Sequence, residues 1–197
     1  MVPEQSVSSI AVDLSQLHRR TLTSFYSNLV TRPTGRAIRM GVESQLAEME
    51  GDRRICLSIL DFTQVRVLDY SCADEIVAKL LLRYAAPDRP ADAYFLARGL
   101  HEHHRDAVEA VLEHHDLLLV AQDVSGEAHL LGPSNPLERA CWDALTRRGR
   151  ASPRELAAAA GLPYDTVSPA VQALVERRVA LTLLGDVVCS LTSFCGE

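Results

Sequence analysis

Lysine is nearly absent from the sequence: Lys79 is the only one, so arginine supplies almost all of the 20 basic residues. Aromatic residues are also few, at 5%, and the five cysteines form no Cys-x-x-Cys pair. An odd cysteine count without such pairs does not suit a disulfide framework and favours reduced thiols in a cytoplasm. The 26 acidic residues give a formal net charge of −6, which argues against a strongly basic nucleic-acid-binding domain.

Long hydrophobic runs and enzyme motifs are also missing. No apolar run approaches the roughly 18 residues of a membrane helix, and the first residues do not have the pattern of a signal peptide. We therefore expect a cytoplasmic protein with no membrane segment. The chain has no Gly-x-Ser-x-Gly elbow and no phosphate-binding GxxxxGK[ST] loop. We expect no enzymatic activity, no cofactor and no metal.

Apolar patterns in the first two thirds of the chain alternate between strand and helix. The residues "TRPTGR" (31–36) read as a turn, and a continuous apolar run at 54–62 reads as a central strand covered on both faces. This order predicts an α/β layer with a partly parallel sheet. The expected strands are 8–15, 54–62, 92–98, 117–122 and an edge strand at 126–132, and the expected helices are 36–50, 71–84 and 100–116.

The last 60 residues have a different pattern, and "GPSNP" (132–136) separates them from the rest. We expect one domain at 1–132 and another at 136–197. The second has three predicted helices, at 137–149, 152–161 and 164–178, followed by a hairpin turning at Gly185 and Asp186. Ser152 and Glu155 form a capping-box pattern, Asp165 is a plausible cap, and Pro169 is expected in a first helical turn. This order is typical of a winged helix-turn-helix.

The segment "ICLSILDFTQVRVLDYSCADEIVAKLLLRY" (55–84) resembles the STAS-like branch of the STAS family, which includes the anti-sigma-factor antagonists of bacteria. In that family a core strand leads to an Asp-Ser-Ser-Gly type of turn and then a helix. Asp69 matches the aspartate and Ser71 the serine that partner kinases phosphorylate, whereas Tyr70 and Cys72 depart from the pattern. The similarity covers roughly residues 8–132. It implies a mixed sheet with helices and a docking surface for a kinase or regulator.

Ser71 has two readings from the residues alone. A serine or aspartate at a helix start caps the helix, but the same helix end would also stabilise an added phosphate. The neighbouring carboxylates would repel that phosphate. Asp69, Ser71, Cys72 and Asp74 are the candidate partner-binding residues. A nucleophilic role for Cys72 is disfavoured, since no histidine or lysine is locally placed to activate it.

Two other clusters, one of histidines and one of arginines, are candidate ligand sites. His101 and His104 lie one helical turn apart and offer two metal ligands, but no third ligand is visible in the sequence, so a solvated helix end is the preferred reading. His104 and His115 are 11 residues apart, too far to share one ion. The arginines of the 31–39 region suit either an anion pocket or ion pairs with local acids.

The predicted second domain raises the question of DNA. Its recognition helix would offer Thr166, Ser168 and Gln172 to base edges, and the domain is neutral, with seven basic and seven acidic residues in 136–197. The residues expected to meet phosphates are Arg147, Arg148, Arg150 and Arg154. We therefore expect a non-enzymatic bacterial regulator whose docking domain controls a DNA-binding winged helix. The alternative is an adaptor whose winged helix contacts a protein partner or a second copy of the chain without binding DNA.

Overall fold

The computed structural model describes residues 18–22, 28–47, 55–183 and 186–194. The chain divides between Ser134 and Asn135 into two compact units, which we describe separately. The strand expected at 8–15 and the Gly185 half of the expected hairpin turn lie outside the described residues. Within the described residues, no helix has the length and apolar character to cross a membrane.

The first unit contains a five-stranded mixed sheet in the order β1-β3-β5-β6-β7. β1 (His18–Leu22), β3 (Cys56–Asp61), β5 (Ala93–Arg98) and β6 (Leu119–Gln122) are parallel, and β7 (Ala128–Leu131) is antiparallel at the edge. The predicted α/β class is therefore confirmed. β3 lies between β1 and β5 and is buried from Cys56 to Leu60, as the continuous apolar run predicted. Strand β1 was not expected.

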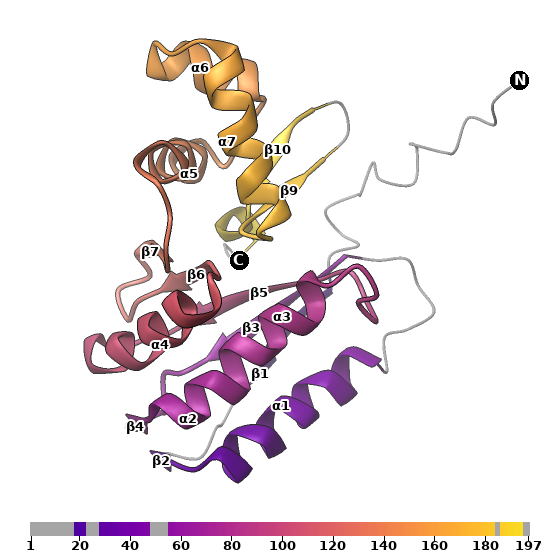
Figure 1. Ribbon diagram of the computed structural model, residues 1–197, viewed down its shortest axis with the longest axis vertical. Helices are drawn as coiled ribbons and strands as arrows, with labels where there is room; N and C mark the ends of the chain where they lie inside the picture. Colours follow the sequence, from indigo (N-terminus) through magenta and orange to yellow (C-terminus); the bar gives the residue numbers. More distant parts are fainter. Residues whose placement is uncertain (1–17, 23–27, 48–54, 184–185, 195–197) are drawn as a thin grey trace, which may run out of the picture. The chain divides into compact units, whose positions relative to one another are not determined.

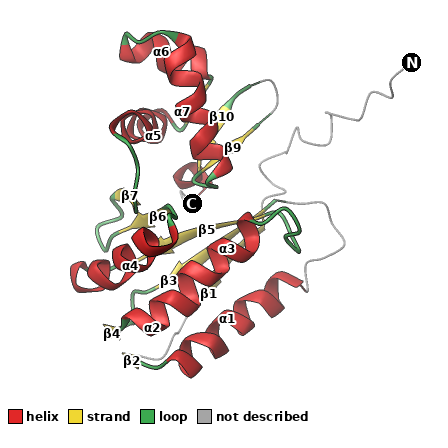
Figure 2. Cartoon of the chain, viewed as in Figure 1, coloured by secondary structure: helices red, strands yellow, loops and turns green. Residues whose placement is uncertain are grey.

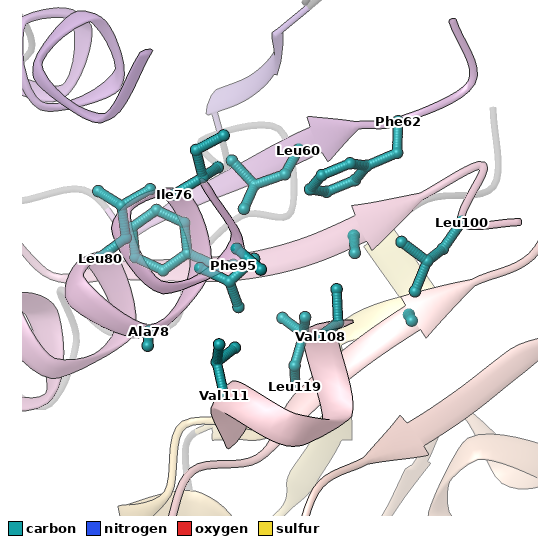
Figure 3. Close-up of a cluster of buried hydrophobic side chains, with 14 of the residues drawn as sticks. Leu60, Phe62, Ile76, Ala78, Leu80, Phe95, Leu100, Val108, Val111 and Leu119 are labelled. Atoms are coloured by element: carbon teal, nitrogen blue, oxygen red, sulfur yellow. The ribbon is translucent and has the colours of Figure 1, made fainter. Parts of the chain in front are cut away.

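Three helical segments pack against this sheet and form its core (Figure 1). They are α1 (Arg32–Ala47), a long helix at 70–85, and α4 (Glu102–His115). Figure 3 shows Ile76 and Leu80 of the long helix beside Leu60 and Phe95 of the strands. Because side chains from all three helical segments join one apolar cluster, they cover the same face of the sheet.

Helix α1 begins four residues earlier than the sequence indicated, so the expected turn at 31–36 was wrong. The Thr31 hydroxyl accepts a hydrogen bond from the Thr34 N–H at 3.3 Å, as a cap does. Pro33 lies in the first helical turn, where an N–H has no helical partner anyway. Val42 and Leu46 are buried on one side of this helix, and Ile38 is partly buried there. Their spacing of four residues is that of one apolar helix face.

The long helix at 70–85 is α-helical at both ends and π-helical in its centre. It comprises α2 (Tyr70–Ala73), the π-helical segment η3 (Asp74–Ala78) and α3 (Lys79–Ala85). A π segment inserts one extra residue into the helical repeat and so rotates the side chains that follow. Every residue of η3 is buried, including the acids Asp74 and Glu75. A short parallel pair, β2 (Asn28–Leu29) with β4 (Val67–Leu68), lies before the two helices α1 and α2.

The second unit has three helices and a three-stranded antiparallel sheet (Figure 2). The helices are α5 (Pro136–Arg148), α6 (Pro153–Ala160) and α7 (Tyr164–Glu176). The strands β8 (Arg150–Ala151), β9 (Ala180–Thr182) and β10 (Val188–Ser190) pair in the order β8-β10-β9, followed by a short 3-10 turn, η4 (Leu191–Phe194). The β9–β10 hairpin and the Ser152–Glu155 capping box are confirmed.

Two details of helix α7 differ from the sequence-based expectation. Its cap position is Pro163, which makes no side-chain hydrogen bond, so Asp165 lies inside the first turn rather than capping it. Pro169 is the sixth residue of the helix, beyond the first turn, and removes an internal hydrogen bond. The two-residue strand β8 is too short to have a sequence signal and was missed.

Candidate docking site and its surroundings

The start of helix α2 is held by Asp69. Its carboxylate accepts hydrogen bonds from the Cys72 N–H at 2.8 Å and from the Ser71 hydroxyl at 2.9 Å. The Asp69 N–H donates to the Leu29 carbonyl at 2.9 Å, which anchors the helix start to β2. Asp69 is therefore the cap, and Ser71 is a half-buried hydroxyl bound to it.

Cys72 lies inside the protein and not on a surface. It is fully buried, and its thiol donates to the Thr31 carbonyl at 2.9 Å. Burial, together with the nearby charges of Asp69 and Glu75, raises the pKa of the Cys72 thiol. A protonated and inaccessible thiol neither touches a partner nor acts as a nucleophile. Cys56, Cys141 and Cys189 are also buried.

Asp74 and Glu75 form an ion-pair network inside the first unit. Asp74 contacts Arg32 at 3.2 Å and His115 at 2.9 Å, and lies 3.8 Å from Lys79. Burial alone would raise the pKa of Asp74, but the hydrogen bond from His115 and the charges of Lys79 and Arg32 outweigh it and lower that pKa. Asp74 therefore connects α1, the long helix and α4, and its carboxylate faces these partners and not the solvent.

Glu75 is paired in the same way. Arg32 lies 3.3 Å away, Arg39 3.4 Å away, and Lys79 is in direct contact. The pKa of Glu75 is lowered because the Lys79 and Arg39 interactions exceed the opposing effect of burial. Arg32 and Arg39 of the 31–39 region thus pair with local acids, the second of the two readings above. An anion pocket at this place would require Arg32 and Arg39 to leave these carboxylates.

Gly35 allows α1 and the long helix to approach closely beside this network. A methyl group at residue 35 would lie 2.9 Å from the Glu75 Cβ and 3.0 Å from the Cys72 Cα. Any larger residue would push the two helices apart. In the sequence, Gly35 belongs to "TRPTGR" (31–36), a pattern typical of a turn. The sequence therefore did not indicate that this glycine lies where two helices meet.

Exposed apolar side chains gather around the start of α2. Val30 follows β2, Val67 lies in β4, and Tyr70 opens α2; they are 47%, 46% and 43% exposed. The β2–β4 pairing, which places Asn28 beside Val67 and Leu29 beside Leu68, brings these distant parts of the chain together. We call Val30, Val67, Tyr70 and the neighbouring Asp69 and Ser71 the docking edge. Single exposed apolar residues are ordinary, but three around one helix start mark a candidate interaction surface.

The histidines at the start of α4 are not a uniformly solvated helix end. The rings of His101, His103 and His104 lie in mutual contact, and His104 is completely buried. Neither ring nitrogen of His104 has a hydrogen-bond partner of good geometry, although the Arg66 backbone is close enough to oppose the lowering of its pKa. Burial, followed by the neighbouring His103 and His101, lowers the pKa of His104 to about 4. The sequence showed these three residues but not that His104 points inward.

Among the described residues, one group of side chains has ligand atoms spaced closely enough to hold a metal ion, and it lies at the β6–β7 hairpin, where sequence reasoning found none. One ligand atom from each of Asp123, Glu127 and His129 lies within 4.8 Å of the others. One Asp123 oxygen accepts hydrogen bonds from the Ser125 hydroxyl and from the N–H groups of Ser125 and Glu127. The other Asp123 oxygen accepts from His129 Nε2 at 3.2 Å. Hydrogen bonds from Ser125 and then His129 are the main causes of the lowered pKa of Asp123. This arrangement is a tight turn held by a carboxylate.

The candidate DNA-binding residues of the second unit are mostly accessible. Thr166 and Gln172 are exposed on α7, and Ser168 is half-buried. Arg154 lies over the Tyr164 ring, with its guanidinium carbon 4.9 Å from the ring centre. All four candidate phosphate-binding arginines are exposed: Arg147, Arg148, Arg150 and Arg154.

The charge on α7 itself is acidic. Asp165 and Glu176 are the only charged residues of this helix, and the Gln172 amide donates to Glu176 at 3.1 Å. Between β9 and β10, the residues 183–187 contain Asp186 and no cation. Leu162 and Tyr164, at the turn before α7, are exposed apolar residues. The helix and hairpin that would approach DNA therefore carry no positive charge.

The chain matches no model of a protein family, and comparisons with curated proteins and with solved structures also find no match.

Proposed function

We propose that the protein is a non-enzymatic regulatory adaptor, built from a STAS-like unit that docks a protein partner and a winged-helix unit that contacts a second one. The observation that carries this proposal is the docking edge, where Val30, Val67 and Tyr70 are exposed around the capped start of α2. The STAS-like assignment is supported by the first unit, in which helices cover one face of a sheet whose parallel strands follow chain order. The winged-helix assignment is supported by the second unit, which combines three helices with the β8-β10-β9 sheet.

The surface of the second unit favours a protein partner. An interface core is depleted in charge and enriched in tyrosine and other large side chains. The α6–α7 turn has this character, since Leu162 and Tyr164 are exposed and the Arg154 guanidinium lies over the Tyr164 ring. Arginine is also enriched in such interfaces. A second copy of the chain is one such partner.

Phosphorylation of Ser71 would act on the docking edge through the Asp69 cap. A phosphate carries roughly −1.5 to −2 charges at neutral pH. It would be attached to the Ser71 hydroxyl oxygen, which now donates to the Asp69 carboxylate at 2.9 Å, so this hydrogen bond would be lost and two negative groups would become neighbours. We propose that this modification weakens the cap and releases a partner, and that it does not create a binding site.

Site-directed photo-cross-linking tests the docking edge. A benzophenone amino acid placed at Val67 or Tyr70 should give a covalent adduct of defined mass in the cells that produce the protein. The matched control is the same group at Glu113, which is exposed on α4 away from the edge. A dimer-sized adduct identifies a second copy as the partner. Absence of adducts at 67 and 70, or equal adducts at 113, would contradict the proposal.

DNA binding by the second unit is the second candidate function, and the four exposed arginines favour it. Binding to mixed genomic duplex fragments should then fall steeply as salt rises. Each of the changes Arg147→Ala and Arg148→Ala should weaken binding on all fragments and reduce the salt slope by about 1. Arg36→Ala, at an exposed arginine of the first unit, is the control. If the protein does not bind DNA even at low salt, only the adaptor function is left.

A further inference from the structure

The turn between α6 and α7 contains the longest exposed run in the described part of the chain. Residues 158–166 are nine consecutive exposed residues, whereas other exposed runs within the described ranges have four residues at most. Most of the nine are apolar: three alanines that end α6, then Leu162, Pro163 and Tyr164. We call residues 158–166, together with Arg154, the turn surface. Apolar residues exposed together at one place mark a surface that another molecule covers.

Backbone hydrogen bonds hold the turn surface in one shape. Gly161 ends α6 in the left-handed conformation, with a φ of 65°, and the Leu162 N–H donates to the Ala157 carbonyl at 3.0 Å. At the start of α7, the Val167 N–H donates to the Pro163 carbonyl at 3.2 Å. A surface that is already ordered loses little conformational entropy when a partner binds.

Two opposite charges flank the exposed Tyr164 ring. The Arg154 guanidinium carbon lies 4.9 Å from the ring centre, and Asp165 is the next residue along α7. Both charged residues are exposed. Glu155, which follows Arg154, accepts hydrogen bonds from the N–H and the hydroxyl of Ser152 in the capping box. The turn surface therefore has one cation and one anion, and its net charge favours neither a basic nor an acidic partner.

We infer that the turn surface binds the same surface of a second copy of this chain, in a two-fold symmetric dimer. A two-fold interface brings one patch against itself, so the patch has to be complementary to itself. The apolar residues around Leu162 and Tyr164 pack against their counterparts, and Arg154 of each copy lies against Asp165 of the other. Tyrosine and arginine are the residue types that most often dominate the binding energy at such a centre.

This inference rests on the proposed adaptor function, in which the second unit contacts a protein, and it names that protein. The dimer and DNA would compete for the same residues. Thr166 and Arg154, which the DNA hypothesis assigns to a base edge and to a phosphate, both belong to the turn surface.

Sedimentation equilibrium of the full chain over a wide concentration range tests the dimer. A standard interface has about 20–30 residues per partner and the turn surface has fewer, so we expect reversible association with a Kd of roughly 1–100 µM. The mass should rise from 21.6 kDa towards twice that value. Tyr164→Ala should weaken the association by at least ~10-fold, because it removes the central side chain.

Charge reversal distinguishes a second copy from any other partner. Arg154→Glu and Asp165→Arg should each weaken self-association, because each brings two like charges together. An equimolar mixture of the two variants should associate again, since every contact between them then joins opposite charges. This recovery requires both variants to be folded and so controls for misfolding. Arg147→Glu, at an exposed arginine of α5 outside the turn surface, is the matched control and should leave the affinity unchanged.

The dimer is wrong if the chain remains monomeric up to ~1 mM, a concentration at which even a weak complex forms. It is also wrong if the two charge variants associate as well as the unaltered chain, or if their mixture does not associate. If the chain is monomeric and a benzophenone amino acid at Leu162 cross-links a different protein, the adaptor function is retained and only the dimer is wrong. If the monomeric chain instead binds duplex DNA and Arg154→Glu abolishes this binding, both the dimer and the adaptor role of the second unit are wrong.

Discussion

His104 is a titratable side chain that is completely buried in the first unit. A neutral, fully buried imidazole with no hydrogen bond is stable only while it stays unprotonated, because its charged form would lose hydration without gaining a partner. Its pKa of about 4 in the folded protein, against 6.5 as the reference value, expresses this penalty. Burial is the largest cause, and the rings of His103 and His101 add to it.

The stability of the protein should therefore fall as the pH is lowered from about 6.5 to about 4. In this window the unfolded chain binds a proton at residue 104 and the folded chain does not, so protons favour unfolding. The lowered pKa corresponds to a loss of up to about 3 kcal/mol at pH 4, measurable by urea unfolding across the pH range.

His104→Leu should remove this pH dependence, because leucine has no titrating group, while His114→Leu in the same helix should leave it unchanged. Asp74 and Glu75 contribute in a lower window: their pKa values are lowered in the fold, so their stabilisation is lost as pH falls through those folded values. An unaltered slope between pH 6.5 and 4.5 in His104→Leu would contradict the assignment.

At the scale of the elements, the contact of α1 with the long helix depends on one glycine. Gly35 and Gly41 lie in the same helix, but only Gly35 faces a neighbour: a methyl group there meets Cys72 and Glu75, whereas nothing lies within 4 Å of one at Gly41. Alanine substitution at Gly41 therefore tests helix propensity alone, whereas alanine substitution at Gly35 also tests the packing of the two helices. The π segment η3 belongs to the same contact, since it turns both Asp74 and Glu75 inward.

Gly35→Ala should destabilise the protein and Gly41→Ala should stabilise it. At position 41, alanine lowers the conformational entropy lost on folding and contributes about 0.5–1 kcal/mol. At position 35 the same gain is outweighed by overpacking against backbone, which costs typically about 1–3 kcal/mol. Urea unfolding of both variants measures the difference. If Gly35→Ala is as stable as Gly41→Ala, the close approach of the two helices is wrong.

At the scale of the whole molecule, each of the two units has apolar residues enough for its own core. In the second unit these include Trp142, Leu145, Leu156, Val171, Leu174 and Val179, all buried. A unit of this size is close to the lower limit for independent folding without metals or disulfides. The capping boxes at Asn135 and Ser152 add local stability to its first two helices.

We expect a fragment of residues 135–197 to fold alone and to unfold cooperatively. Its α5, α6 and α7 contact one another and its strands pair only with one another, so no described strand pairing crosses the boundary at Ser134. Circular dichroism with thermal melting, and dispersed amide resonances in NMR spectra, are the measurements. A fragment that is unfolded in isolation would show that residues 135–197 are not a domain in their own right.

The periodic patterns of the sequence were sufficient to predict most elements. The helix that buries Val42 and Leu46 and the apolar strand β3 were predictable because burial leaves a local apolar pattern. The start of α6 was predictable because Ser152 and Glu155 hydrogen-bond the free N–H groups there. Errors occurred where two local signals competed. Pro33 and Gly35 read as a turn but lie in α1, because the first turn tolerates proline and the helix contact requires glycine.

The sequence alone determined the α/β character of the first 130 residues, the helices and hairpin that follow, and the residue types available for chemistry. Only the tertiary structure decided which of those residues meet. Cys72 and Asp74 were expected at a surface and are buried, whereas Val30, Val67 and Tyr70 are exposed around one helix start. The reason is physical: periodicity reports that a face is buried, but the partner of each side chain depends on strand pairing and helix packing between residues about 40 positions apart.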